Sequence, residues 1–387
     1  MPAAVPRLDL VTWDREGPTG GNVYNRALVA ELRALGIDVR MHKLPGPWPD
    51  GDATMHARLA RALQAAPACL VDGIVACGSP DVVAAAVESG HVVTIVVHLP
   101  ITDEVGLDPV QRERYAVLEA QALHAAAGVL CSSRWSAAEL SRRYGRSDIG
   151  VAIPGVTRAS AAPGSQDSGL PRFLSVASLT PTKDQLTLVQ ALVQVADLSW
   201  RADLVGSDQA NPDYAARLRA RIVAAGLQDR ISVPGALVSA ALDQKWDATD
   251  LLVLPSRIET YGLVIIEALA RGIPAVVTAG TGAVEALGSG GTAQAVVTPG
   301  TAVPAGDAER LAAVLRSWLT EPTLRREWRQ AALARRDTLP GWQQTAQAVL
   351  AYLYRLPKPL STLTGSPPAP PPTLPPVPPP SAASSPY

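Results

Sequence analysis

The chain has 387 residues, of which 47% are hydrophobic, and its formal net charge is −1. This length predicts two domains with sizeable cores, and the near-neutral charge gives no electrostatic reason to expect nucleic acid or an anionic membrane as a strong partner. No apolar run approaches the ~20 residues that a membrane-spanning helix needs, and the amino-terminal segment lacks a signal-peptide pattern. We therefore expect a soluble, cytoplasmic protein.

The first part of the chain alternates short apolar strands with helical segments. A strand is expected at 7–13, then a Gly-rich loop, then a helix from Val23 to Leu35. Four further apolar runs of strand length follow, at 37–41, 69–75, 92–98 and 128–133. Repeated βαβ units of this kind predict a doubly wound parallel sheet.

A second sheet is expected after a linker. Residues 157–171 are polar, rich in Gly and Pro and without periodicity, as linkers are. The βαβ pattern then restarts, with expected strands at 172–179, 200–206, 230–235, 250–254 and 275–277 and expected helices near 182–195, before Gly226 and over 263–270. The economical fold is α/β, with two Rossmann-like, doubly wound domains facing each other across a ligand cleft.

The carboxyl-terminal segment 357–387 is rich in proline. Proline lacks an amide donor and cannot continue a helix or a central strand, so we predict a disordered, partly polyproline II tail. A passive tail is favoured over a docking segment, because composition alone produces PxxP strings.

The cysteines Cys69, Cys77 and Cys131 have neither disulfide nor metal-site spacing. Three reduced thiols in the core are expected, since isolated cysteines of a cytoplasmic protein stay reduced.

The stretch from Pro255 to Thr278 predicts an anion site. An apolar strand precedes it, and a helix from Leu263 to Ala270 follows a Thr-Tyr-Gly turn. Such a loop lies at the carboxyl end of parallel strands, where ligands bind. The amides of 260–263 would point outward, unpaired, at the positive end of the helix dipole.

Two glutamates bracket these amides. Glu259 lies on the loop and Glu267 lies inside a helix that is apolar nearly all round, where a carboxylate is costly without a partner. Two solvated glutamates would be the simpler interpretation of the pair alone. In this context we predict that they flank one cavity and bind a ligand with both hydroxyls and phosphates, such as a nucleotide sugar.

The pattern PS-x-x-E-T-Y-G-L-x-x-x-E-A-L-A-x-G-x-P-A-V resembles the signature of retaining glycosyltransferases of the family 4 type, glycosyl transferases group 1, which have the GT-B fold. The resemblance covers most of residues 7 to 355. It implies that Glu267 binds the nucleotide ribose, that Glu259 contacts the transferred sugar, and that Thr260, Tyr261, Gly262 and Leu263 contribute to the donor site.

The same resemblance implies how the chain is divided. The expected parts are an amino-terminal acceptor domain (1–157), a linker (158–171), a nucleotide-sugar donor domain (172–338), a final helix that crosses back to the first domain (339–356) and the Pro-rich tail.

Two candidates lie in the first domain. Gly20 and Gly21 follow the first strand without the dinucleotide fingerprint. A plain tight turn is the simpler interpretation, but the resemblance implies that their backbone approaches the donor diphosphate and that Asn22 lies beside ligand oxygens. His98 ends an apolar strand; a lone His is more often structural, and the resemblance implies a contact with the transferred sugar.

Lys183 is one of only four lysines beside thirty arginines. A solvated loop charge is the simpler interpretation, but the choice of Lys here indicates a use for a compact ammonium. The family has an Arg and a Lys five residues apart that neutralise the leaving diphosphate, and this chain has Ser178 at the Arg position. The departure removes one charge-assisted contact, for which Thr180 or Thr182 could compensate.

Three other signals are weaker. Gly235 and Leu237 match a loop that contacts the base in relatives, and Asp72 ends a strand either as a turn or as an acceptor-side residue. The basic cluster at 142–146 favours a solvated helix face over weak peripheral membrane docking.

We therefore expect a hexosyltransferase that uses a UDP-, GDP- or ADP-hexose and an unidentified acceptor, with no cofactor and no metal. Lys183, Glu259 and His98 are the expected catalytic residues. Alternatives are a nucleotide-sugar epimerase or hydrolase, or a non-catalytic nucleotide-sugar-binding protein. A nicotinamide-dependent oxidoreductase is disfavoured by the missing fingerprint.

Overall fold

A computed structural model describes residues 7–15, 19–165, 169–288 and 297–356. The predicted disordered tail lies outside the described residues, as do parts of the Gly-rich loop and of the linker.

Six parallel strands form the first sheet, in the order β2-β1-β3-β4-β5-β6. Their bounds are Arg7–Trp13 (β1), Asp38–Leu44 (β2), Ala68–Asp72 (β3), Val92–Val97 (β4), Gly128–Cys131 (β5) and Ile149–Val151 (β6). β4 is buried along its whole length, because helices cover both faces of the sheet, as is usual for parallel strands.

The helices of this domain form one core on each face of the sheet. The first core contains side chains from α2, α4, α5 and α6, and the second contains side chains from α1 and α14. The helices are α1 (Gly20–Ala34), α2 (Ala53–Gln64), α3 (Gly73–Ala76), α4 (Pro80–Glu88), α5 (Pro109–Ala125), α6 (Arg134–Tyr144) and, from the end of the chain, α14 (Trp342–Leu353), with a 3-10 turn η1 at Ile101–Asp103.

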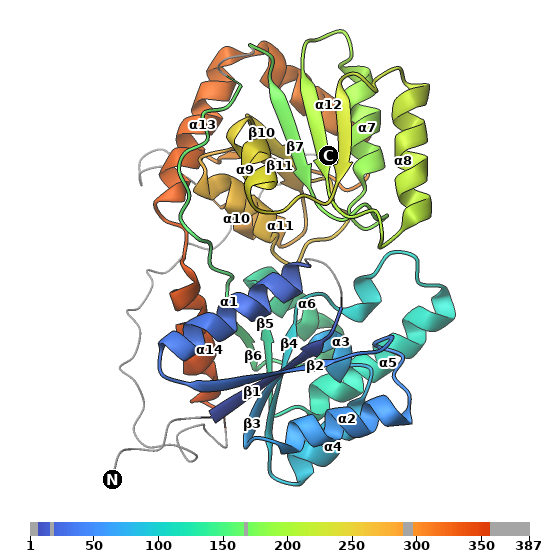
Figure 1. Ribbon diagram of the computed structural model, residues 1–387, viewed down its shortest axis with the longest axis vertical. Helices are drawn as coiled ribbons and strands as arrows, with labels where there is room; N and C mark the ends of the chain where they lie inside the picture. The colour runs from blue at the N-terminus through green and yellow to red at the C-terminus, as the bar shows by residue number, and fades with distance from the viewer. Residues whose placement is uncertain (1–6, 16–18, 166–168, 289–296, 357–387) are drawn as a thin grey trace, which may run out of the picture.

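The last helix returns to the first sheet. In Figure 1, α14 lies beside α1 and β6, away from α13 that precedes it. The Trp342 ring packs edge-on against Tyr24, with ring centroids 5.7 Å apart. The Tyr352 hydroxyl accepts a hydrogen bond from the Val129 amide over 2.9 Å. These contacts fix α14 to the first domain.

The second sheet also has six parallel strands, in the order β12-β11-β10-β7-β8-β9. They are β7 (Arg172–Val176), β8 (Arg201–Val205), β9 (Ile231–Gly235), β10 (Leu251–Val253), β11 (Ala275–Thr278) and β12 (Gly300–Val303). One face packs against α7 (Gln185–Gln194), α8 (Pro212–Ala224) and α12 (Ala308–Thr320), and the other against α9 (Ser239–Asp247), α10 (Leu263–Ala270), α11 (Ala283–Leu287) and α13 (Pro322–Arg336).

Both sheets reverse their strand order at one point, between β1 and β3 and between β7 and β10. Ligands of open α/β sheets bind at such points, at the carboxyl ends of the strands. Figure 1 shows the domains one above the other, with α1 and α6 of the first near α10 and α11 of the second. The predicted fold class of two Rossmann-like, doubly wound domains is confirmed.

Two local predictions were wrong, and two short strands were missed. The helix expected from Val23 begins at Gly20, because the Thr19 side chain caps it by accepting from the Asn22 amide. The third strand ends at Asp72 rather than continuing to residue 75, because Asp72 caps the short helix α3. The short strands β6 and β12 lay outside the predicted elements.

The three cysteines are buried and unpaired, as predicted. Over the part of the chain that the structure describes, none of the helices combines the length and the apolar character needed to cross a membrane.

Candidate active site

The part of the site that lies in the second domain is built where α10 begins. The chain leaves β10 and turns at Gly262, whose φ of 94° is strained for any residue with a Cβ. A Cβ there would also lie 2.6 Å from Cδ1 of Ile265. Glycine therefore allows the helix to start immediately after the loop, with its first amides directed outward.

A second glycine holds this loop in place. The Gly282 amide donates to the Glu259 carbonyl over 2.8 Å. A Cβ on Gly282 would lie 1.9 Å from the carbonyl oxygen of Thr260. The two backbones are thus in direct contact, and the position of the loop at 259–260 is set by main-chain packing.

Lys183 and Glu259 meet at this edge of the sheet, although they are 76 residues apart. The Lys183 ammonium donates to Oε1 of Glu259 over 2.6 Å, and their side chains are 29% and 11% exposed. Lys183 comes immediately before Asp184, which precedes α7 and has a φ of 48°. The structure therefore brings together two of the three residues predicted to be catalytic.

Glu267 lies one turn further along α10. Burial raises the pKa of its carboxyl group to about 7, and the nearby Arg271 guanidinium opposes the rise. Within the described residues the carboxylate accepts no hydrogen bond; Arg271 donates to the Glu267 backbone carbonyl and to Asp243 instead. A half-buried, unpaired carboxylate of this kind can accept hydrogen bonds from ligand hydroxyls.

Two other residues predicted for the donor site, Tyr261 and Ser178, make contacts within the second domain. The Tyr261 side chain is only 3% exposed and belongs to the core, so only its backbone faces the loop. Ser178 follows β7, and its carbonyl accepts from the Gln185 side chain over 3.0 Å. Because the Ser178 side chain is short and uncharged, Lys183 remains the cation that is predicted to bind the diphosphate.

The first domain contributes a hydrogen-bonded network centred on Asn25, which is 2% exposed. The Asn25 amide nitrogen donates to Thr12 Oγ1 over 3.3 Å and to Asp72 Oδ2 over 3.4 Å. The Thr12 hydroxyl donates to the same Asp72 oxygen over 3.1 Å. On its other side, Asn25 Oδ1 lies 2.9 Å from Nε2 of His98.

This network selects one tautomer of His98. The Asp72 carboxylate can only accept, so the Asn25 NH₂ group must face it, and the Asn25 oxygen must face His98. His98 Nε2 is then the protonated nitrogen, and Nδ1 keeps its lone pair. Burial lowers the pKa of His98, against an opposing effect of Asp72, so the neutral ring is favoured. His98 is therefore an oriented hydrogen-bond acceptor.

The parts of the site that lie in the two domains are in direct contact. The Thr260 hydroxyl donates to the His98 carbonyl over 2.6 Å. A Cβ on Gly21 would lie 2.9 Å from the His98 ring, and one on Gly20 would lie 3.7 Å from Leu263. The first turn of α1, the end of β4 and the start of α10 therefore converge, which unites predicted residues that lie up to 243 positions apart in the sequence.

Asn25 and Thr12 were not among the predicted residues. The available signal was an amide four residues after Gly21 on the helix face that also carries Leu28, Val29 and Leu32, since a polar group on a buried face needs partners. Asp72, which the sequence left open between a turn and a site residue, caps α3 and also anchors this network.

The weaker candidates have local roles. Gly235 has a φ of 84°, and its carbonyl accepts from the Gly206 amide. Leu237 packs at the edge of the core. Arg142, Arg143 and Arg146 each pair with a carboxylate of the same domain. Across the described ranges, no group of three or more His, Cys, Asp or Glu residues could hold a metal ion.

Comparison with known families finds a similarity in the second domain. Residues 158–335 match the model of the family described as Glycosyl transferases group 1. This range contains Lys183, Glu259 and Glu267, so the match includes the part of the site that lies in the second domain.

Among curated proteins, the chain is 31% identical over 255 residues to D-inositol 3-phosphate glycosyltransferase of Kineococcus radiotolerans, covering 60% of this chain and 58% of that protein. It is 28% identical over 258 residues to D-inositol 3-phosphate glycosyltransferase 1 of Catenulispora acidiphila, covering 61% and 59%. The aligned part spans less than two thirds of these relatives.

Among solved structures, the chain is similar to sucrose-phosphate synthase from Thermosynechococcus elongatus, with a TM-score of 0.73, 21% identity, and 90% of this chain and 98% of that chain covered. It is also similar to HepE of Anabaena in complex with UDP-glucose, with a TM-score of 0.71, 19% identity, and 90% and 100% covered. At these identities the likeness shows the fold, which is the expected GT-B fold.

Proposed function

We propose that this protein is a glycosyltransferase that moves a hexose from a nucleotide sugar to a hydroxyl of an acceptor, since residues 158–335 match the model of the Glycosyl transferases group 1 family. The observation that carries the proposal is the convergence, where the two domains meet, of the α10 amino terminus, the Lys183–Glu259 pair and His98. Cationic and hydroxyl-binding groups stand there within reach of one ligand.

The donor diphosphate is bound by the start of α10 and by Lys183. The amides before and at Leu263 point outward at the positive end of the helix dipole and suit an anion. The Lys183 ammonium, held by Glu259, adds a full positive charge beside them. As the bond to the sugar breaks, negative charge grows on the leaving diphosphate, and groups fixed in advance stabilise it without reorganising.

The two glutamates bind hydroxyl groups. Glu267 has no partner within the described protein, so its carboxylate is available to the ribose of the nucleotide. Glu259 has one oxygen on Lys183 and one for the transferred hexose. His98 faces the same hexose with Nδ1 as an acceptor. The backbone of Gly20 and Gly21 lets the donor approach the start of α1.

In the proposed reaction the acceptor oxygen attacks the anomeric carbon from the side on which the diphosphate leaves. The carbon–oxygen bond to the diphosphate breaks, and a phosphate oxygen takes the acceptor proton. The configuration at the anomeric carbon is retained, and no metal is required because Lys183 and the helix amides carry the neutralising charge. Retention and metal independence rest on the family resemblance.

UDP-glucose is the first donor to test, since HepE was solved with it. Inositol 3-phosphate is the first acceptor to test, because the curated relatives are named for it. A second candidate function, nucleotide-sugar binding without transfer, is favoured by Ser178, where the family has an arginine.

Calorimetric titration with UDP-, GDP- and ADP-glucose in the presence of a metal chelator tests the proposal, with Glu267→Ala as the control. We expect saturable binding of one donor and its loss in the variant, followed by a glycosylated product whose anomeric configuration NMR reports as retained. A folded protein that binds none of the donors contradicts the proposal. Binding without product from any acceptor supports the second candidate function.

A further inference from the structure

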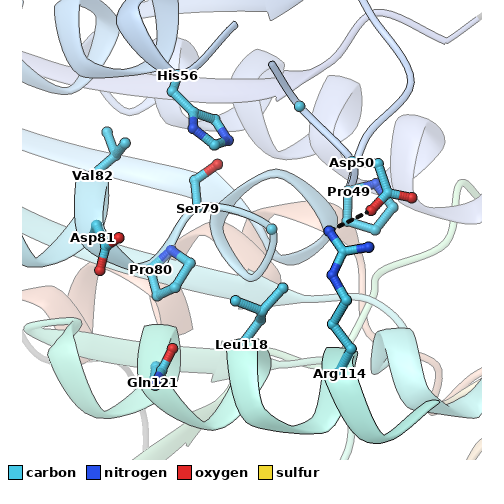
Figure 2. A pocket seen from close by; sticks show the side chains of 12 residues that line it. Pro49, Asp50, His56, Ser79, Pro80, Asp81, Val82, Arg114, Leu118 and Gln121 are labelled. Atoms are coloured by element: carbon cyan, nitrogen blue, oxygen red, sulfur yellow. Dashed lines mark ion pairs between the residues drawn. The ribbon is translucent and has the colours of Figure 1, made fainter. Parts of the chain in front are cut away.

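A cavity of about 410 Å³ lies on the flank of the first domain, apart from the candidate active site. It is partly open to solvent and is lined by the loop after β2, the starts of α2 and α4, and one face of α5 (Figure 2). None of the candidate active-site residues lines it. Its volume is within the range of ~300–1,000 Å³ that is usual for small-molecule sites.

Two buried polar atoms in this cavity have no hydrogen-bond partner within the described residues: Oγ of Ser79 and Nε2 of His56. Ser79 is only 2% exposed. It occupies the position before α4 where a serine side chain normally caps the helix, yet it makes no such bond. Figure 2 shows its hydroxyl directed toward the His56 ring at the wall of the cavity. Unpaired groups of this kind are rare in proteins unless they serve a ligand or water.

The walls of the cavity are fixed by direct contacts. A Cβ on Gly78 would lie 2.2 Å from the carbonyl oxygen of Pro49, so the loops that carry Ser79 and Asp50 touch through their backbones. Asp50 accepts a hydrogen bond from the buried Tyr115 hydroxyl over 2.6 Å and forms an ion pair with Arg114 over 3.0 Å. The cavity therefore exists without a ligand.

The charge of the lining disfavours anions. Arg114 is neutralised by Asp50, which leaves Asp81 as an unmatched carboxylate beside the cavity. The remaining polar groups are a hydroxyl, an imidazole and the Gln121 amide. They offer both donors and acceptors, the combination that hydroxyl groups of a ligand satisfy in both directions. Pro80 and Leu118 add apolar surface between them.

We propose that this cavity is a second binding site of the protein, which takes a neutral, hydroxyl-rich ring of hexose size. The ring places one hydroxyl between Ser79 and His56, and further hydroxyls on Asp81 and Gln121. Its C–H face lies on Pro80 and Leu118. The proposal does not depend on the transfer reaction, because the cavity shares no residue with the donor site.

Histidine-ring NMR tests the proposal without any activity measurement. The chain has five histidines, so each ring signal can be assigned by single substitution, with His56→Gln identifying the relevant one. Glucose and mannose are titrated as neutral probes, glucosamine as a cationic probe and inorganic phosphate as an anionic probe. We expect glucose or mannose to shift the His56 signal saturably while the His98 signal is unchanged.

Ser79→Ala removes the unpaired hydroxyl at little cost in stability, because that hydroxyl has no partner to lose. We expect it to weaken the sugar-dependent shift of His56 by about three- to tenfold in affinity. Ser175→Ala is the matched control, since Ser175 Oγ is likewise buried and unpaired but lies on β7 of the other domain. It should leave the titration unchanged.

Three results overturn the proposal: a His56 signal that no sugar shifts, a shift caused by phosphate or glucosamine but not by the neutral sugars, or equal sugar affinities in wild type and Ser79→Ala. A sugar-dependent shift confined to His98 places the sugar in the active-site cleft and overturns it as well.

Discussion

In both domains the candidate site lies where a parallel strand ends and a helix begins at a glycine, but the side chains around the two positions differ in charge. The start of α10 is flanked by Lys183, Glu259 and Glu267. The start of α1 is flanked by His98 and Asn25, held by hydrogen bonds to Thr12 and to one anion, Asp72. The second domain therefore suits a ligand whose charge changes, and the first suits the orientation of an uncharged group.

Removing the cation should have the largest effect. We expect Lys183→Ala to lower kcat by about 10²–10³-fold, as losing one fixed group at a developing negative charge does. Donor affinity, measured by calorimetry, should fall much less, because the helix amides remain. Steady-state kinetics with the donor identified by titration checks the split between the two.

Lys245→Ala is a matched control for that change. Lys245 pairs with Asp203 over 2.6 Å in the same domain, with side-chain exposures of 30% and 11% that nearly equal those of Lys183 and Glu259. Equal losses of activity in both variants would mean that the ion pair acts through folding alone.

The next largest effect concerns the pH dependence of donor binding. The Glu267 pKa of about 7 means that the carboxyl is increasingly protonated below pH 7, and a protonated carboxyl accepts ribose hydrogen bonds poorly. Donor affinity should therefore rise with pH and level off above about 7. Glu267→Gln should bind the donor roughly ten- to a hundredfold more weakly above pH 7 and lose the pH dependence; a dependence that survives would assign it to another group.

Glu267→Gln should weaken donor binding above pH 7 but stabilise the folded protein there. A carboxyl whose pKa is raised by folding stabilises the native state below its unfolded value near 4.5 and loses that contribution as the pH rises through about 7. Glu267→Gln should therefore raise the melting temperature above pH 7 by a few degrees, with no gain near pH 4. Thermal unfolding at the two pH values measures this difference.

A smaller effect is expected from a change in the hydrogen-bonded network centred on Asn25. Asn25→Ala frees the His98 ring from the tautomer that its partner imposes, and kcat/KM should fall about three- to tenfold. In a His98→Ala background the same substitution should cost almost nothing, because Asn25 acts through the ring. Additive losses in this double-mutant cycle would show that Asn25 only supports the fold.

The smallest effect is expected from a substitution that restores a charge. Ser178→Arg puts a guanidinium where relatives of the family carry one, and leaving-group stabilisation by two cations should raise kcat/KM a few-fold, at most about tenfold. No gain, with unchanged donor affinity, would mean that the lost arginine is already compensated in this chain.

The sequence predicted the residues around the start of α10 better than the network around the start of α1, for a local reason. Gly262, the helix start and both glutamates lie within one continuous stretch, so spacing alone placed the amides between the two carboxylates. The sequence did not predict the pairing of Lys183 with Glu259, which depends on β7 and β10 lying side by side in the sheet. The amino-terminal network joins residues 12, 25, 72 and 98, which come from four separate elements, and no local pattern links them.

The errors in the predicted helix and strand boundaries come from side-chain and backbone contacts that the apolar pattern does not show. Thr19 extends α1 to include Gly20 and Gly21, and Asp72 ends β3 early, because side-chain caps compete with the apolar pattern that defined the predicted ends. The strand β12 begins at Gly300, where a Cβ would lie 1.8 Å from the Ala275 carbonyl. Such a close approach depends on a neighbouring strand that local sequence does not specify.

The amino-acid sequence by itself determined the two βαβ domains, because apolar periodicity and glycine positions are local properties of the chain. It also predicted a ligand site at Glu259, Glu267 and the amides between them, because one motif holds all of these groups. Only the tertiary structure decided the tautomer of His98, the hydrogen bond from Thr260 to the opposite domain, and the cavity with the unpaired Ser79. Each of these depends on groups far apart in sequence whose distances are set by packing.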